Sequence, residues 1–110
     1  MARRFGQTLR IRPECFDEYR RQHAHVWPEI LDALRAAGVR NYSIFHHEGR
    51  LFGYFEYVGP DAEFAARMER LARAPRMREW WDSMEPMQIP DERRAPGEWW
   101  STMSEVFHLD

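Results

Sequence analysis

The chain has 110 residues and a formal net charge of −2, which fits a single domain of residues 1–110. Because the charge is close to balanced and the basic residues form no run, nothing in the sequence favours nucleic acid as a partner. Hydrophobic residues make up 44% and aromatic residues 15%, enough for a core with apolar surface left for a pocket or a subunit interface.

All 16 basic residues are arginine, and this choice removes several mechanisms. Without lysine, the chain has no amine for a Schiff base and no lysine for a phosphate-binding P-loop. Its single cysteine, Cys15, has no partner for an internal disulfide. The sequence shows neither a signal peptide nor an apolar run near the roughly 20 residues of a membrane helix, so we expect a cytoplasmic protein with no membrane partner.

The N-terminal segment predicts a strand. Residues 4–12 alternate in polarity, which places Phe5, Gln7, Leu9 and Ile11 on one face. One face of this strand is therefore expected to be buried and the other to meet solvent.

Two prolines divide the next segment into helices. Pro13 suits the first turn of a helix, where its missing N–H costs nothing. Pro28 predicts a break near Trp27, because proline disfavours helical geometry at the residue before it. A second helix should then run to Ala37, with Gly38 as its C-terminal cap.

The middle of the chain predicts a β-hairpin. Residues 41–47 and 51–58 are rich in aromatic and β-branched side chains, and Glu48-Gly49-Arg50 between them suits a turn. These two strands should pair with each other.

The remaining residues predict helices, a loop and a last strand. Pro60 and Asp61 open a helical segment, and Pro75 interrupts it before a further helix. The stretch 85–97 carries three prolines among charged residues, which is typical of a loop, and residues 105–109 predict a short C-terminal strand.

This order of elements predicts an α+β fold of the ferredoxin-like βαββαβ type. Helices on one face of a four-stranded sheet leave the other face bare, and a second copy of the chain covers such a face with one self-complementary surface. We therefore expect a homodimer whose sheets pack into a dimeric α/β barrel.

Tyr19 and His23 lie one helical turn apart on the first helix, so their side chains address the same small volume. An imidazole exchanges protons near neutral pH, and the pair would suit proton transfer on a small molecule. From spacing alone, a partly exposed helix face with a hydrogen-bonded histidine is the favoured explanation of the pair, by roughly two to one.

The other histidines do not predict a metal site. His23 and His25 are two residues apart on a helix and point in nearly opposite directions, and no third ligand has suitable spacing. His46 and His47 are neighbours on a strand and face opposite sides of the sheet, so at most one of them reaches a given pocket. The sequence thus predicts no metal.

Two pairs of adjacent tryptophans stand out. An indole face suits the CH patch of a sugar ring and its N–H supplies a donor, so Trp80 and Trp81 are candidates for sugar binding, with core packing as the alternative. Trp99 and Trp100 follow the proline-rich stretch and are expected at an interface or in a lid over a site.

With these residues, the chain resembles the L-rhamnose mutarotase family. The resemblance spans nearly the whole sequence, and its most specific part is the spacing from Tyr19 through His23 to Trp27-Pro28-Glu29. The other similar segments are Asn41-Tyr42-Ser43-Ile44-Phe45, Trp80-Trp81 with Met84, and Glu105-Val106-Phe107-His108-Leu109. The chain departs from the family's pattern just after the histidine, where Ala24 and His25 replace an asparagine or aspartate and, in some members, a proline.

The resemblance implies a dimeric α/β barrel that interconverts the α and β anomers of the monosaccharide L-rhamnose without a metal or organic cofactor. By matching positions, it implies that His23 is the catalytic proton donor, that Tyr19 binds substrate beside it, and that Trp80 and Trp81 bind the sugar. The Ala24-His25 departure would alter the rim of the pocket and with it the preference among related sugars.

Mutarotation needs a proton delivered to the ring oxygen and another removed from the anomeric hydroxyl. We expect His23 to protonate the ring oxygen, and Tyr19, a bound water or a nearby carboxylate to accept the anomeric proton. Two alternatives remain at this stage: a cofactor-free monooxygenase on a similar dimeric barrel, and a non-catalytic sugar-binding module.

Overall fold

The computed structural model describes residues 2–110, so Met1 of the predicted 1–110 domain lies outside the described residues. Helices and strands alternate in the predicted order, and no helix among residues 2–110 is long and apolar enough to cross a membrane. The elements are β1 (Arg3–Ile11), α1 (Phe16–His23), α2 (Pro28–Ala36), β2 (Val39–His47), β3 (Arg50–Tyr57), α3 (Phe64–Arg73), α4 (Pro75–Met84), β4 (Gln88–Ile89) and β5 (Ser101–Met103).

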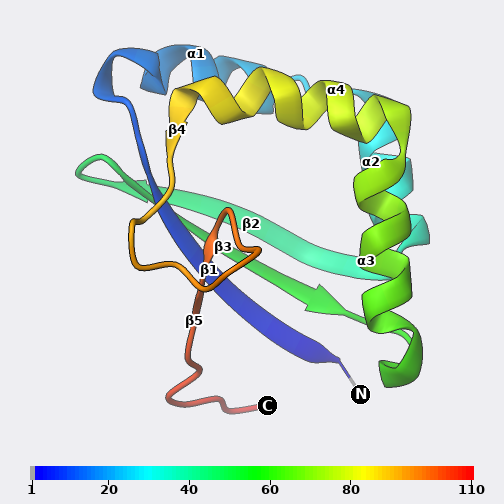
Figure 1. Ribbon diagram of the computed structural model, residues 1–110. Helices are drawn as coiled ribbons and strands as arrows, with labels where there is room; N and C mark the ends of the chain where they lie inside the picture. The colour runs from blue at the N-terminus through cyan, green and yellow to red at the C-terminus, as the bar shows by residue number, and fades with distance from the viewer. Residues whose placement is uncertain (1) are drawn as a thin grey trace.

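The sheet has the strand order β2-β3-β1-β4, and each neighbouring pair is antiparallel. The helices lie together over one face of this curled sheet, while the C-terminal segment leaves β5 on the other side (Figure 1). This arrangement confirms the α+β, ferredoxin-like fold predicted from the sequence.

Strand β1 is central in the sheet, and its last three residues show the predicted alternation, with Arg10 exposed between the buried Leu9 and Ile11. Leu9 and Ile11 are 0% and 1% exposed, and Leu9 lies opposite Leu51 of β3, which is 1% exposed. Helix residues such as Met77 and Trp80 complete the same buried cluster from above. The helix-facing side of the sheet is therefore the core.

Proline sets the start of both α2 and α4, and of the short 3-10 turn that precedes α1. Trp27 before Pro28 is extended, with φ −60 and ψ 136, which confirms the predicted break. The break turns the chain between α1 and α2 and keeps α1 short, so that His23 stands at its last turn.

The C-terminal strand predicted over residues 105–109 is wrong, because that segment forms no strand. The edge of β1 is instead occupied by two short strands, with Gln88 and Ile89 opposite Ile11 and Arg10, and β5 opposite residues 6–8. Thus β4 lies inside the stretch predicted as a loop. An ion pair between Arg4 and Glu105 holds the start of the tail, which then leaves the sheet.

The hairpin turn is shorter than predicted. His47 pairs with Arg50, so Arg50 belongs to β3 and the turn consists of Glu48 and Gly49. Both turn residues have positive φ, 49 and 81 degrees, which matches the twist of a tight two-residue hairpin. The rest of the predicted hairpin is confirmed.

Gly38 and Gly49 make a matched pair for a stability test. Both have positive φ, but a Cβ at Gly38 would lie 2.9 Å from the Tyr57 ring and 3.0 Å from the Val58 carbonyl oxygen, whereas one at Gly49 meets nothing within 4 Å. We expect Gly38→Ala to lower the free energy of unfolding by about 3 kcal/mol and Gly49→Ala by about 1 kcal/mol. Urea denaturation measures both, and equal losses would contradict the close approach at Gly38.

Candidate active site

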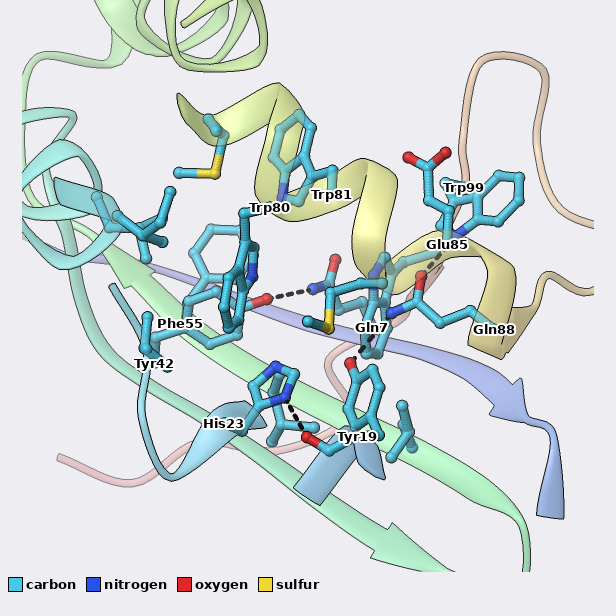
Figure 2. Close-up of a pocket in the computed structure, with 18 of the residues that line it drawn as sticks. Gln7, Tyr19, His23, Tyr42, Phe55, Trp80, Trp81, Glu85, Gln88 and Trp99 are labelled. Carbon is cyan, nitrogen blue, oxygen red and sulfur yellow. Dashed lines mark hydrogen bonds between the residues drawn. The ribbon is translucent and has the colours of Figure 1, made fainter. Parts of the chain in front are cut away.

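A pocket of about 1230 Å³ lies between the sheet and the helices that cover it. Most of its lining is apolar, with Ile44 and Leu51 from the sheet and Met77 and Met84 from α4. A few polar side chains converge on it, as is typical of sites for small molecules. These polar or aromatic residues are Gln7, Tyr19, His23, Tyr42, Trp80, Gln88 and Trp99 (Figure 2).

Helix α1 brings Tyr19 and His23 together, as their spacing predicted. Their ring centroids are 4.3 Å apart, and Nδ1 of His23 lies 2.8 Å from the backbone oxygen of Tyr19 (Figure 2). A carbonyl oxygen only accepts hydrogen bonds, so Nδ1 must donate and carries the ring proton. In the neutral imidazole, Nε2 is then an acceptor with a free lone pair.

The surroundings of His23 favour this neutral form. Burial lowers the pKa of His23 below its usual 6.5, and the hydrogen bond to the Tyr19 carbonyl offsets only part of that effect. At neutral pH the imidazole is therefore uncharged and ready to accept a proton at Nε2.

Tyr19 is 4% exposed, and its hydroxyl lies in a buried chain of hydrogen bonds. Nε2 of Gln88 donates to the Tyr19 hydroxyl oxygen at 3.0 Å, and Nε1 of Trp99 donates to Oε1 of Gln88 at 2.8 Å (Figure 2). Burial raises the pKa of Tyr19 well above its ordinary value. The phenol therefore keeps its proton at neutral pH and is an acid or a hydrogen-bond donor, not a base.

A second phenol enters the pocket from β2. Tyr42 packs against Phe55 with ring centroids 5.5 Å apart, and Gln7 of β1 donates from Nε2 to the Tyr42 hydroxyl at 3.3 Å. Burial of the phenol oxygen raises the pKa of Tyr42 to about 12, although the residue as a whole is 39% exposed. Both phenols thus present neutral hydroxyls.

The two tryptophans of α4 have different places. Trp80 is 7% exposed, and its ring lies edge-on to His23 at 5.4 Å and to Trp27 at 5.2 Å. Trp81 also lines the pocket, but its ring is turned away from His23 (Figure 2), and the Arg78 guanidinium lies 5.7 Å from its centroid. The structure brings Tyr19, His23 and Trp80 together and leaves Trp81 at the edge.

The remaining histidines follow the predicted pattern. His46 lines the pocket and stacks on Phe16 at 3.8 Å, while its Nε2 accepts a hydrogen bond from the backbone N–H of Gly49. The His47 side chain is 77% exposed and does not line the pocket. Within residues 2–110 no group of three histidine, cysteine or acidic side chains is placed to hold a metal ion.

Sequence reasoning missed several polar residues of the pocket, among them Gln7, Tyr42, Glu85 and Gln88. Gln7 was assigned to the buried face of β1, and a polar residue among apolar neighbours on such a face is a detectable signal. Tyr42 lies in a segment whose aromatic and β-branched residues predict a strand, and that pattern does not distinguish a pocket residue from a core residue. Gln88 gave no signal, because the proline-rich stretch around it predicted a loop.

The comparisons with known proteins identify the family. A family model for L-rhamnose mutarotase matches residues 4–109, nearly the whole chain. The chain belongs to the L-rhamnose mutarotase family. The L-rhamnose mutarotase of Lactiplantibacillus plantarum is 36% identical over 97% of this chain and 98% of its own length. That of Bacillus subtilis is 32% identical over 98% of this chain and 99% of its own length.

Solved structures share the fold. The crystal structure of an L-rhamnose mutarotase from Formosa agariphila is similar with a TM-score of 0.75 and 24% identity, covering 98% of this chain and 99% of that one. An antibiotic biosynthesis monooxygenase is similar with a TM-score of 0.56 and 16% identity, over 96% and 99% of the two chains. The fold alone thus serves both the mutarotase family and a monooxygenase.

The tautomer of His23 is directly measurable. We expect ¹⁵N NMR of the imidazole to show a proton on Nδ1 at neutral pH, and the ring to titrate with a midpoint below 6.5. Because this pKa is lowered, the favourable burial of the neutral ring is complete above pH 6.5 and is lost as the pH falls through the lower folded value. The His23→Asn protein assigns the resonance, and a proton on Nε2 would contradict the geometry.

Proposed function

We propose that this chain is an isomerase that interconverts the α and β anomers of L-rhamnose or a closely related deoxysugar. The observation that carries the proposal is the neutral His23 imidazole next to the protonated Tyr19 phenol, beside the Trp80 ring and inside the pocket of an L-rhamnose mutarotase family member. The names of the relatives support the same reaction.

The pocket offers matching surfaces for a monosaccharide. Trp80 supplies an aromatic wall for the CH groups of the ring, and Trp81 extends that wall at the edge of the pocket. Tyr19 supplies a hydroxyl donor close to His23. The methionines and leucine of the lining suit the methyl group of a 6-deoxysugar. We therefore assign sugar binding to Tyr19, Trp80 and Trp81.

The proton steps follow from the protonation states of the two side chains. Nε2 of His23 accepts the proton of the anomeric hydroxyl while the bond between C1 and the ring oxygen breaks. The electron pair of that bond passes to the ring oxygen, which takes a proton from the Tyr19 hydroxyl. The open-chain aldehyde rotates about the C1–C2 bond, and closure on the other face of the carbonyl runs both transfers in reverse.

In this scheme His23 acts first as a base and then as the proton donor implied by the family resemblance, since it returns its proton to the carbonyl oxygen on closure. The order differs from the one expected from the sequence, in which His23 protonates the ring oxygen first. The hydrogen bond from Nδ1 to the Tyr19 carbonyl supports the new order, because it leaves Nε2 unprotonated. The raised pKa of Tyr19 likewise argues against this phenol as the base.

Anomer exchange by saturation-transfer NMR tests the assignment. We expect His23→Asn to slow exchange by about 100-fold to 10,000-fold, the usual contribution of a positioned acid or base. His25→Asn is the matched control, since His25 lies just beyond α1 and does not line the pocket. A folded His23→Asn protein that exchanges anomers as fast as the parent would exclude His23 as the catalytic group.

The same assay separates the alternatives. A monooxygenase would consume oxygen with a quinol or haem substrate and leave sugar anomers unexchanged, and a binding module would bind sugar without exchanging its anomers. The family match favours the mutarotase over both. A panel of L-rhamnose, L-fucose and L-lyxose would identify the preferred sugar.

We further propose that the chain is a homodimer. Phe45 is 65% exposed and Met103 37%, and both lie on the face of the sheet that the helices leave uncovered. The tail beyond β5 adds Val106, Phe107 and Leu109, which are 96%, 80% and 79% exposed. A second copy would cover the sheet face and the tail through one self-complementary surface. The cytoplasmic location stays a prediction from the sequence.

Sedimentation measures the oligomeric state. We expect the parent to sediment as a dimer, and Phe45→Glu and Phe107→Glu to shift it to monomer, because a charge buried between two apolar surfaces opposes association. Ala66→Glu on the exposed side of α3 is the control and should leave the dimer intact. A parent that sediments as a monomer at all concentrations would overturn the proposal.

A further inference from the structure

We infer that Gln88 and Trp99 are positioning residues that fix the direction of the Tyr19 hydroxyl, so that its proton points into the pocket toward the ring oxygen of the sugar. This inference deepens the proposed function and rests on it. Neither Gln88 nor Trp99 is assigned to the chemistry itself, because each acts through Tyr19.

The direction of the Tyr19 hydroxyl follows from which groups can donate and which can accept in the hydrogen bonds from Trp99 through Gln88 to Tyr19. An indole N–H only donates, so the Trp99 contact at 2.8 Å requires an oxygen on the facing side of the Gln88 amide. That places the amide nitrogen on the other side, 3.0 Å from the Tyr19 hydroxyl oxygen. An amide nitrogen likewise only donates, so the Tyr19 oxygen accepts and its own proton is left for another partner.

Contacts around Gln88 and Trp99 hold the row of hydrogen bonds from Trp99 to Tyr19 in this direction. Gln88 is 6% exposed and lies in β4, where it pairs with Ile11 of the central strand. Trp99 comes from the loop between β4 and β5, and a two-contact ion pair between Arg50 and Asp91 ties that loop to the sheet. Turning the Gln88 amide over would set its N–H₂ against the Trp99 N–H, so the buried amide would lose this hydrogen bond and two donors would face each other.

The other phenol of the pocket shows what a less constrained arrangement looks like. Gln7 donates to Tyr42 as Gln88 does to Tyr19, but among residues 2–110 no side chain donates to the Gln7 amide oxygen. The Gln7 amide can turn over, so the Tyr42 hydroxyl can donate or accept. Of the two phenols Tyr19 and Tyr42, Tyr19 alone has the direction of its hydroxyl hydrogen bond fixed by a third residue within residues 2–110.

A fixed donor is what ring opening requires. The ring oxygen gains an electron pair as its bond to C1 breaks, and a proton already aimed at it needs no rearrangement at that moment. Gln88 stays hydrogen-bonded to the Tyr19 oxygen as the phenol releases its proton, which opposes the rise that burial causes in the pKa of Tyr19.

The sharpest variant is Gln88→Glu, which keeps the size of the side chain and reverses one hydrogen bond. An ionised carboxylate accepts from both Trp99 and Tyr19, so the Tyr19 proton turns away from the sugar. We expect kcat/KM for anomer exchange to fall by about 10-fold to 100-fold, mainly through kcat, near pH 8. Gln22→Glu on α1, which does not line the pocket, controls for the added charge.

The pH profile separates positioning from a structural role. When the introduced carboxyl is protonated, its C=O can accept from Trp99 while its O–H donates to Tyr19, which restores the original direction. Because position 88 is buried, the pKa of the introduced carboxyl should lie above the ordinary glutamate value of about 4.3, and the activity of Gln88→Glu relative to the parent should rise as the pH falls from about 8 to about 5.5. Gln88→Leu removes both hydrogen bonds and should show no such recovery.

Two further variants test whether Trp99 and Gln88 act through Tyr19. Trp99→Phe keeps an aromatic ring but frees the Gln88 amide to turn over, and we expect a smaller loss of about 3-fold to 10-fold. In a Tyr19→Phe background, Gln88→Glu should have no additional effect, because the group that it acts through is absent.

A readout without activity keeps this inference distinct from the proposed function. The infrared C–O stretch of Tyr19, isolated by difference against Tyr19→Phe, should report an accepting phenol in the parent and a donating one in Gln88→Glu. If that band does not change, or if Gln88→Glu and Gln88→Leu lose equal activity at every pH, the inference is overturned. If the parent shows the band but exchanges no anomers, the proposed function fails instead.

Discussion

The pocket depends on one constraint, which is that every buried polar group beneath the helices must find a partner with the correct polarity. The face of β1 that carries Leu9 and Ile11 is buried beneath the helices. In the pocket the Tyr19 carbonyl meets Nδ1 of His23, and the Gln88 amide meets two neighbours at once. No buried side-chain nitrogen or oxygen among residues 2–110 lacks a hydrogen-bond partner. Burial therefore holds the side chains in place and also determines which of them carries a proton.

The helices and the sheet supply different groups to the pocket. Short helix α1 supplies the two groups assigned to proton transfer and ends at His23, before the break at Trp27 that precedes α2. Helix α4 supplies the Trp80 wall, which Trp27 supports from the far side. The sheet contributes orientation through Gln88 of β4, which bonds to both Tyr19 and Trp99. The groups assigned to proton transfer thus lie on a helix, while Gln88, which contacts the Tyr19 hydroxyl directly, lies on a strand where backbone pairing limits its movement.

The sequence predicted the parts of this arrangement that local periodicity records. Alternation identified β1, the prolines marked the helix starts, and the spacing of Tyr19 and His23 predicted their contact, which the structure confirms. The two short strands on the edge of β1 were missed because a pair of residues such as Gln88 and Ile89 has no period, and residues 105–109 were taken for the strand that β5 provides. The Gln88 network was invisible for a related reason, since it joins side chains 69 residues apart through a hydrogen bond that leaves no pattern in the chain.

The loop between β4 and β5 has a particular position in this fold. Its base is tied to the sheet through Arg50 and Asp91, and Arg94 bonds to the Glu98 carbonyl within it, while Trp99 reaches from it into the pocket. Because the loop is held at its base, residues near Trp99 can be substituted without displacing the His23 imidazole or the strands. Substitutions near Trp99 would then reshape the part of the pocket wall that this loop supplies and leave the proton-transfer groups of α1 in place.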